Sequence, residues 1–264
     1  MDIKSLEALE QENITLLRGQ LADHFALLES ARDLLMQEVY LALDSAKHDQ
    51  QDPLPLDLQV AVQIVTRIAN DCRSVTLLAE KGYVLQSMGL VATIFEMCIV
   101  GLDLFGNAPK AEQWLKHTDP YQWNDKGPKD LTKQVLQKLG FSDADVEKEW
   151  GYYKWLCVGK HGNPVLQRQY GRSVTLYGKQ QFGNYVEAGP QVTDEAIEEL
   201  WFTLGMLFRA VGRVLTSFSN PYLHRALSDV DYTKTACDLG DEVRAFHDKA
   251  AAVHQAMAGR YAKS

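Results

Sequence analysis

The sequence predicts an all-α protein, a multi-helix bundle of roughly seven to nine helices. Its eight prolines gather in a few places and leave long uninterrupted segments. Within those segments apolar residues recur at three- and four-residue spacing, which is the period of a helix. Residues 162–190 interrupt this pattern, because they hold five glycines and two prolines. We expect an irregular excursion there, in which "SVTLY" could form one strand of a hairpin.

The first half of the chain predicts a series of helices. Residues 3–48 contain one glycine and no proline, and they form one long helix or two helices with a break near Gly19. The loop "QQDPLPLD" follows, and Asp57 is the expected cap of a helix that ends at "EKG", residues 80–82. An apolar helix over 84–105 ends at "FGNAP", and a short helix over 109–117 carries Trp114.

The second half begins with the loop "TDPYQWNDKGPKD", residues 118–130, where we expect mobility. A short helix follows and is closed by Gly140, and the "SDAD" capping signal at 142–145 starts a helix that runs to about Val158. Thr193 caps a long amphipathic helix that stops at "SNP", and a last helix covers about 233–260. We interpret the chain as a single helical domain, with an N-terminal helical arm over 1–55, a bundle core over 56–220 and a C-terminal helix over 221–264.

Composition narrows the classes of function. A chain of 264 residues with 46% apolar and 23% charged residues can bury a substantial core. Its net charge of −8 argues against a generally basic nucleic-acid binder, although it says nothing about local patches. The four cysteines have no metal-binding spacing, so we expect reduced thiols, no metal and no cofactor. A helical metal site has His and carboxylate ligands at i, i+3 or i+4 on facing helices, and Asp248, His247 and His254 fit that pattern only in part.

One segment of the chain is a candidate for crossing a membrane. Residues 85–104, "LQSMGLVATIFEMCIVGLDL", are close to spanning length. Glu96 at the centre and Asp103 near the end would be expensive in lipid, and no basic cluster flanks the segment. We therefore predict the central buried helix of a bundle. The acidic, amphipathic N-terminus "MDIKSLEALEQEN" is unlike a secretory signal, so we expect a cytoplasmic protein that does not engage a membrane.

A window without acidic residues runs from Trp150 to Val186. At the average frequency of this chain, its length would hold roughly five Asp or Glu. Cations interleaved with aromatic side chains suit phosphate neutralisation and base stacking, so the window predicts a face for RNA or another phosphate-rich partner. A helix that is half core, with solvated cations, would give the same pattern. The residues assigned to this face are Lys160, Arg168, Arg172, Lys179, Trp155 and Tyr153.

Three residues are candidates for acid–base chemistry. His161 ends its predicted helix, where the helix dipole favours a cation, and Lys154 lies two turns earlier on much the same face. Glu96 has apolar neighbours in sequence, and a buried carboxylate needs a partner or a proton. We predict that Glu96 lies within hydrogen-bond reach of His161, Lys154 or a tyrosine of "YYKWL", lining a shared pocket. The alternatives are a structural or exposed His161, and a structural ion pair for Glu96, with Arg209 and Arg213 as competitors.

The order of these features resembles a functionally uncharacterised family of bacterial all-helical proteins over about residues 60–220. The features are the apolar helix with its central Glu, "VATIFEMCIVGLDLFGNAPKAEQWLKH", then "YYKWLCVGKHGNP", then "YVEAGP" before a long amphipathic helix. That family is similar in turn to HEPN-like domains, including the AbiV type found in phage-defence loci. The resemblance implies a metal-independent ribonuclease, usually dimeric, with an R-x4–6-H motif at a composite site.

Two functions stay open at this point. The first is an RNA- or phosphate-binding protein, and in its HEPN-like ribonuclease form His161 would handle the proton, Lys154 would stabilise the phosphorane and Glu96 would orient one of them. Lys154 stands where the motif has Arg, and the literal match "RGQLADH", Arg18 to His24, is expected by chance. The second is a non-catalytic interaction or immunity-type regulatory protein that works through the helices 1–48 and 233–260. We expect a homodimer, because the N-terminal helix carries more apolar length than one bundle face needs.

Overall fold

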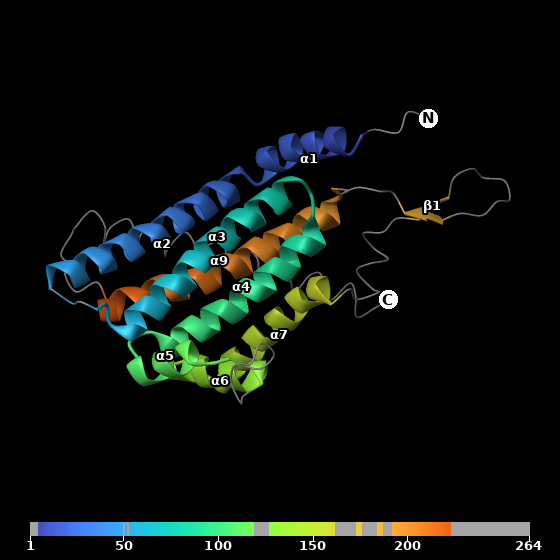
Figure 1. Ribbon diagram of the computed structural model, residues 1–264. Coiled ribbons are helices and arrows are strands. Elements are labelled where there is room, and N and C mark those ends of the chain that lie inside the picture. The colour runs from blue at the N-terminus through green and yellow to red at the C-terminus, as the bar shows by residue number, and fades with distance from the viewer. Residues whose placement is uncertain are drawn as a thin grey trace.

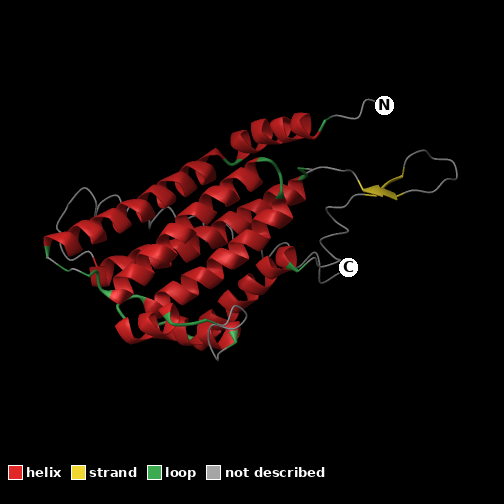
Figure 2. Cartoon of the chain, in the orientation of Figure 1, coloured by secondary structure: helices red, strands yellow, loops and turns green. Residues whose placement is uncertain are grey.

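The computed structural model describes residues 5–49, 51, 53–118, 127–161, 173–175, 184–186 and 192–222. Within these residues it contains eight α-helices and one two-stranded hairpin (Figure 2). The prediction of an all-α, multi-helix bundle is confirmed. The elements are α1 Leu6–Gln20, α2 Ala22–His48, α3 Leu56–Glu80, α4 Val84–Leu104, α5 Ala108–Leu115, α6 Pro128–Lys138, α7 Asp143–Lys160, β1 Ser173–Thr175, β2 Asn184–Val186 and α9 Asp194–Tyr222.

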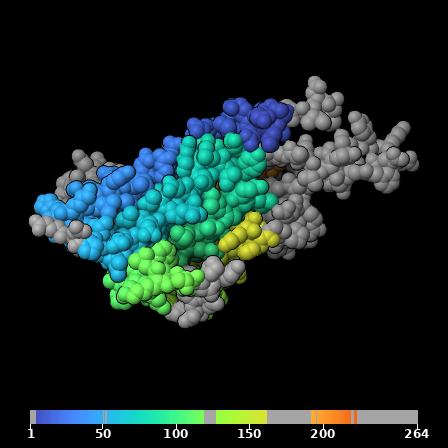
Figure 3. Space-filling model, in the orientation of Figure 1, coloured from blue at the N-terminus to red at the C-terminus, as the bar shows by residue number. Residues whose placement is uncertain are grey.

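The bundle is built around α4, which packs against α3, α7 and α9 (Figure 1). On one side of this centre α2 packs on α3 and α9, and on the other α7 packs on α4 and α6. The short helix α5 packs on α3, and the short helix α6 packs on α7 and α4. Figure 3 shows α1 and α2 following one another along one edge of the molecule, with α3 beside them. The two helices α2 and α7 therefore lie at opposite edges of the bundle.

The N-terminal arm is two helices, and the expected break near Gly19 is confirmed. Ser5 begins α1, where its side chain accepts a hydrogen bond from the N–H of Ala8 at 3.2 Å. Leu21 breaks the helix, with φ −119° and ψ 25°, yet its N–H still donates to the carbonyl of Leu17 at 2.7 Å. Leu17 and Leu21 are both buried, so the break keeps the arm on the core.

Polar contacts hold α1 against the end of α3 and the turn that follows. Glu10 accepts hydrogen bonds from Lys81 Nζ at 2.8 Å and from Tyr83 Oη at 2.7 Å. Arg18 pairs with Glu80 at 2.7 Å. Lys81 is the largest cause that lowers the pKa of Glu10, and the same cluster raises the pKa of Tyr83. We call these five residues the α1 clasp.

The turn between α3 and α4 requires glycine. Gly82 has φ +86°, in the left-handed region, and a Cβ added there would lie 2.8 Å from Asn13 Nδ2. Asn13 is 8% exposed and donates to the carbonyl of Lys81 at 3.0 Å. The predicted end of α3 at residues 80–82 is confirmed.

The apolar helix α4 is the core helix that the sequence predicted. Among the described helices it alone is long and apolar enough to cross a membrane, a test that the core helix of a soluble protein also passes. Its packing against α3, α7 and α9 is compatible with a soluble bundle. Asp103 near its end is 5% exposed and pairs with Lys110 Nζ, so the buried carboxylate has a cationic partner.

Side-chain caps begin α5 and α7, and the sequence predicted the cap of α7. The Asn107 side chain accepts from the N–H of Lys110 at the start of α5, and Ser142 accepts from Asp145 at the start of α7. Gly140, at φ +87°, follows the end of α6. The loop where we expected mobility falls largely on residues 119–126, outside the described residues.

The last described helix, α9, is capped as predicted but runs further. The N–H of Ala196 donates to Thr193 Oγ1 at 3.2 Å. The expected stop at "SNP" is wrong, because α9 continues through Pro221 to Tyr222. A Cβ added to Gly106 would lie 3.3 Å from the Pro221 side chain, so the end of α9 packs closely on the α4–α5 connection.

Tyr222 also explains why the predicted cap at Asp57 is wrong. The helix α3 begins at Leu56 after Pro55, and Asp57 lies in its first turn. The hydroxyl of Tyr222 donates to Asp57 Oδ2 at 3.0 Å and accepts from the N–H of Gly106 at 2.7 Å. A tertiary contact thus engages the carboxylate that we expected to cap the helix.

The excursion at 162–190 contains the expected hairpin. Strands β1 and β2 pair antiparallel, with Ser173 opposite Val186 and Thr175 opposite Asn184. The first strand falls within "SVTLY". The rest of the excursion and the predicted helix at 233–260 lie outside the described residues.

One hydrophobic core connects the helices. Four of its largest fully buried side chains are Phe95, Phe202, Phe208 and Phe218. Cys72 on α3 and Cys98 on α4 are buried free thiols. Burial raises the pKa of Cys72 to about 12 and raises that of Cys98 as well, so both thiols stay protonated at neutral pH.

Candidate functional site

Helix α7 carries the described helical part of the acid-free window, and it is half core and half surface. Tyr153 is 7% exposed and Trp155 is half-buried. Lys154, Lys160 and His161 are exposed. The surface of this part of α7 is therefore cationic, while its rings face the bundle. The other predicted residues of this face lie outside the described part of the chain: Arg168, Arg172 and Lys179.

Glu96 on α4 is joined to α7 by two hydrogen bonds. Tyr153 Oη donates to Glu96 Oε1 at 2.5 Å, and Lys160 Nζ donates to the same oxygen at 2.8 Å. The predicted contact of Glu96 with a tyrosine of "YYKWL" is thus confirmed. The side chains of Glu96 and Lys160 are 35% and 33% exposed, so this contact can be reached by solvent. We call Glu96, Tyr153, Cys157 and Lys160 the seam cluster.

Two glycines bring α4 and α7 into close contact. A Cβ added to Gly159 would lie 2.6 Å from the carbonyl oxygen of Leu85 and 2.8 Å from Met88 Cβ. A Cβ added to Gly89 would lie 3.3 Å from the Cα of Lys160. The backbones therefore touch at this crossing, and the Lys160 side chain extends along the interface to Glu96.

Tyr153 acts as a buried hydrogen-bond donor. Its ring stacks on Phe95, with centroids 5.2 Å apart, and lies 4.8 Å from the ring of Trp150. Burial raises the pKa of Tyr153 far above its usual range, and hydrogen bonding to Cys157 and Glu96 adds to the rise. The hydroxyl therefore stays protonated and directs its proton to the carboxylate of Glu96.

The thiol of Cys157 completes the seam cluster. Burial raises its pKa, although hydrogen bonding to Tyr153 and the charge of Lys160 oppose the rise. Cys157 is half-buried, in contrast to the two core thiols. A raised pKa keeps this sulfur protonated at neutral pH, so it is not an activated nucleophile.

Lys154 and His161, the expected catalytic pair, do not bind Glu96 in the described part of the chain. His161 is the C-cap of α7, and its N–H donates to the carbonyl of Cys157 at 3.0 Å. Lys160 takes the place on Glu96 that we expected for one of these two residues. Tyr153 and Lys160 are seven residues apart and so share a helix face, and this spacing is the signal in the sequence that points to Lys160.

Arg209 and Arg213, the expected competitors for Glu96, bind another carboxylate. Both are on α9 and pair with Glu149 of α7, with Arg213 Nη2 2.8 Å from Glu149 Oε2. Glu149 is fully buried. Burial lowers the pKa of Arg209, and the charge of Glu149 opposes that effect. Sequence reasoning missed Glu149, which directly precedes the acid-free window.

The literal R-x4–6-H match does not form a shared site. Arg18 is exposed and pairs with Glu80 in the α1 clasp. His24 is 2% exposed, and its ring lies edge-on to Trp201 with centroids 3.8 Å apart. The two side chains thus have separate partners.

The described residues contain no group of three or more His, Cys, Asp or Glu side chains that could hold a metal ion. His247, Asp248 and His254, which the sequence analysis considered as metal ligands, lie outside the described residues. What the seam cluster offers is a solvent-accessible carboxylate, held by a protonated phenol and an ammonium group. Such a carboxylate can accept a proton, and its lysine can bind an anion.

Comparisons of the chain with protein families, with curated proteins and with solved structures found no match. Function is therefore inferred from the geometry of α4 and α7.

Proposed function

We propose that the C-terminal half of α7 binds the backbone phosphates of RNA. The observation that supports this most directly is the exposure of Lys154, Lys160 and His161 on a segment without acidic residues, in a protein with a net charge of −8. Phosphates attract such a local patch and release counterions when they bind, whatever the overall charge. Because Tyr153 is buried, the cations rather than that ring supply the contacts.

Glu96 regulates how strongly Lys160 attracts a phosphate. Its carboxylate neutralises the Lys160 ammonium at 2.8 Å, and a phosphate oxygen would compete for the same protons. Tyr153 continues to donate to Glu96 when Lys160 turns away, so the carboxylate keeps a partner. The exposed part of the cluster can therefore exchange partners without leaving the carboxylate unpaired.

A ribonuclease reaction is the extension of this proposal that the HEPN-like resemblance suggests. Glu96 or His161 would take the proton of a 2′-hydroxyl as its oxygen attacks the adjacent phosphorus. Lys154 and Lys160 would stabilise the phosphorane. The residue that took the proton would return it to the departing 5′-oxygen, which leaves a 2′,3′-cyclic phosphate. A role in phage defence rests on the resemblance alone.

The test is the salt dependence of RNA binding, measured by fluorescence anisotropy with a labelled single-stranded RNA. We expect the dissociation constant to rise steeply with salt, and the slope of log affinity against log salt to fall by about 0.7 for each of Lys154→Ala and Lys160→Ala. Lys138→Ala, an exposed lysine on α6, is the matched control and should leave the slope unchanged. No binding at low salt, or equal effects of all three variants, would overturn the proposal.

Glu96→Gln separates binding from cleavage. The amide keeps the shape of the side chain and removes the charge that opposes RNA, so binding should tighten. The free energy of unfolding should change by less than about 1 kcal/mol, because the ion pair is a third exposed. If the protein cleaves RNA, gel analysis of the products should show that this variant binds and no longer cleaves.

A non-catalytic interaction or regulatory protein is the second candidate. It is favoured by large apolar side chains that α1, α2 and α3 leave exposed, namely Leu6, Leu16, Tyr40, Leu56 and Leu77. A protein that binds no RNA, and whose partner binding depends on these side chains, would support this candidate.

A further inference from the structure

The two oxygens of the Glu96 carboxylate have different surroundings. Oε1 accepts both hydrogen bonds of the seam cluster, from Tyr153 Oη at 2.5 Å and from Lys160 Nζ at 2.8 Å. Oε2 accepts none from the residues that the structure describes, and it is not one of the buried side-chain atoms that lack a partner. Since the side chain is 35% exposed, Oε2 is an acceptor open to solvent and to a ligand.

The two donors on Oε1 fix the direction of Oε2. Tyr153 is held by its ring, which is buried and stacks on Phe95. Lys160 approaches from the end of α7, where Gly159 lies against the backbone of α4. An acceptor that is held in place before a ligand arrives loses little entropy on binding, so it can distinguish ligands that differ by one donor.

The pairing of Lys160 with Glu96 matches two neighbouring groups of a ribonucleotide. The ammonium donates and the carboxylate accepts, and the two lie 2.8 Å apart. On a ribose the 3′-phosphate accepts hydrogen bonds, and the 2′-hydroxyl on the neighbouring carbon can donate one. If Lys160 turns from Glu96 to the phosphate, Tyr153 keeps Oε1 in place and Oε2 stays open to the hydroxyl.

A deoxynucleotide would fit the same place poorly. It brings a negative phosphate to Lys160 but offers no hydroxyl to the carboxylate, so Glu96 would only repel it. A ribonucleotide gains a charge-assisted hydrogen bond that offsets this repulsion. The difference between the two sugars therefore depends on Glu96 and not on the number of cations nearby.

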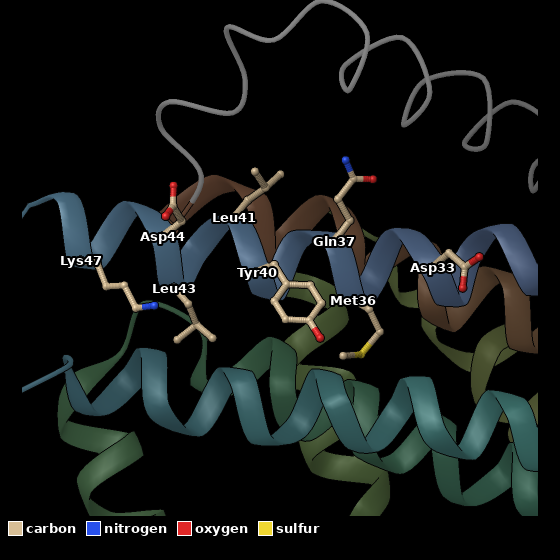
Figure 4. Close-up of a pocket in the computed structure, with 8 residues that line it drawn as sticks. All are labelled: Asp33, Met36, Gln37, Tyr40, Leu41, Leu43, Asp44 and Lys47. Carbon is tan, nitrogen blue, oxygen red and sulfur yellow. The ribbon is translucent and has the colours of Figure 1, made fainter.

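The outer face of α2 offers no comparable place for a phosphate. It carries a pocket of about 750 Å³, and the described lining residues all belong to α2 (Figure 4). Asp33 and Asp44 outnumber Lys47 among them, so the surface around Tyr40 does not attract an anion. Recognition of a nucleotide is thus expected at the seam cluster and not at this pocket.

We propose that Oε2 of Glu96 accepts a hydrogen bond from the 2′-hydroxyl of the nucleotide whose 3′-phosphate binds Lys160, and that the protein thereby selects RNA over DNA. The inference rests on the proposed binding of RNA phosphates by α7. It needs no cleavage, because the hydroxyl keeps its proton while it is bound.

Three oligonucleotides of one sequence test the inference on the unchanged protein: an RNA, a DNA with uracil, and an RNA with 2′-fluoro sugars. Competition against labelled RNA, followed by fluorescence anisotropy at low salt, gives the three dissociation constants. We expect RNA to bind about tenfold more tightly than DNA, which is the effect of one hydrogen bond to a charged group. The 2′-fluoro sugar keeps the shape of ribose but cannot donate, so this RNA should bind as weakly as DNA.

Glu96→Gln tests which residue makes the selection. It removes the charge that repels a phosphate, so the affinity for DNA should rise more than the affinity for RNA, and their ratio should fall to about twofold or less. Glu147→Gln is the matched control, because it removes an exposed carboxylate of α7 that pairs with Lys129, and it should leave the ratio unchanged. Lys154→Ala should weaken RNA and DNA equally.

The outcomes separate this inference from the binding of phosphates. RNA and DNA bound equally well, with a steep salt dependence, would contradict selection by Glu96 and leave phosphate binding by α7 standing. Tight binding of the 2′-fluoro RNA would contradict it too, because the shape of the sugar would then be selected. A ratio that Glu96→Gln leaves unchanged would assign the selection to another residue. If none of the three oligonucleotides binds at low salt, the proposed RNA binding fails and this inference fails with it.

Discussion

Gly159 on α7 lies directly against Gly89 on α4, and a Cβ added to Gly159 would come within 3.2 Å of the Gly89 nitrogen. The same Cβ would lie 2.6 Å from the carbonyl oxygen of Leu85. Backbone atoms cannot move aside as the end of a flexible side chain can. The distance between α4 and α7, and with it the contact of Lys160 with Glu96, therefore depends on the missing side chain at Gly159.

Gly159→Ala should reduce the free energy of unfolding by about 1–3 kcal/mol, because the added methyl forces the two helices apart. Gly151→Ala is the control on the same helix. A Cβ there meets nothing within 4 Å, so the higher helix propensity of Ala should stabilise the protein by up to about 1 kcal/mol. Urea unfolding measures both, and two changes of the same sign would contradict the close contact.

Glu149→Ala should be strongly destabilising, by about 3–5 kcal/mol, because it leaves Arg209 and Arg213 largely buried without their counter-charge. Glu147→Ala removes a carboxylate from the same helix that pairs with Lys129 in solvent, and should cost less than about 1 kcal/mol. Thermal unfolding of the two variants provides the comparison. A small loss for Glu149→Ala would mean that water reaches the arginines.

The α1 clasp should hold over a defined pH range. The pKa of Glu10 is lowered in the folded protein, so its contribution is present above its ordinary value of 4.5 and is lost as the pH falls through the lowered value. The pKa of Tyr83 is raised from 10.0, so its contribution is present below that value and is lost as the pH rises through the raised one. Local amide exchange of α1 should therefore be slowest, relative to α4, between these limits.

Glu10→Gln is the control for that pH dependence. The amide cannot lose or gain a charge, so the acid side of the α1 profile should flatten while the profile of α4 stays the same. An unchanged acid side would show that another group governs the attachment of α1.

Tyr222→Phe should reduce the free energy of unfolding by about 1–2 kcal/mol, because it removes the acceptor of the Gly106 N–H and the donor to Asp57. Asp57→Asn keeps an acceptor for the hydroxyl and should cost less. Chemical unfolding of both variants measures the difference. Equal losses would mean that the charge of Asp57, rather than the hydrogen bond, is what matters.

Local signals in the sequence were sufficient for some helix starts, although α6 begins at Pro128, inside the loop predicted over 118–130. Ser142 and Thr193 cap α7 and α9 as predicted, because a cap is a contact between a side chain and an N–H three residues away. The errors at Asp57 and Pro221 both lie where the end of α9 meets the start of α3. Tyr222, which follows Pro221, donates to Asp57, and no local pattern in the sequence reveals this long-range contact.

The candidate site was predictable in part. The apolar sequence around Glu96 showed that the carboxylate needs a partner, and Tyr153 is one of the residues expected to supply it. The choice of Lys160 over Lys154 depends on how α7 is rotated about its axis. Gly159 and Glu149 fix that rotation through contacts with α4 and α9, and no local pattern in the sequence reveals them.

The free cysteines of the described residues lie at different depths. The order in which they are alkylated therefore shows which part of the protein opens first. Cys72 and Cys98 are sealed in the core, whereas Cys157 lies half-buried between α4 and α7. An alkylating reagent can modify a protonated, buried thiol only after the surrounding structure opens. In a Cys237→Ser background, modification of Cys157 ahead of the other two would therefore measure separation of α7 from α4 while the core stays closed. Simultaneous modification would mean that α7 leaves only when the whole bundle unfolds.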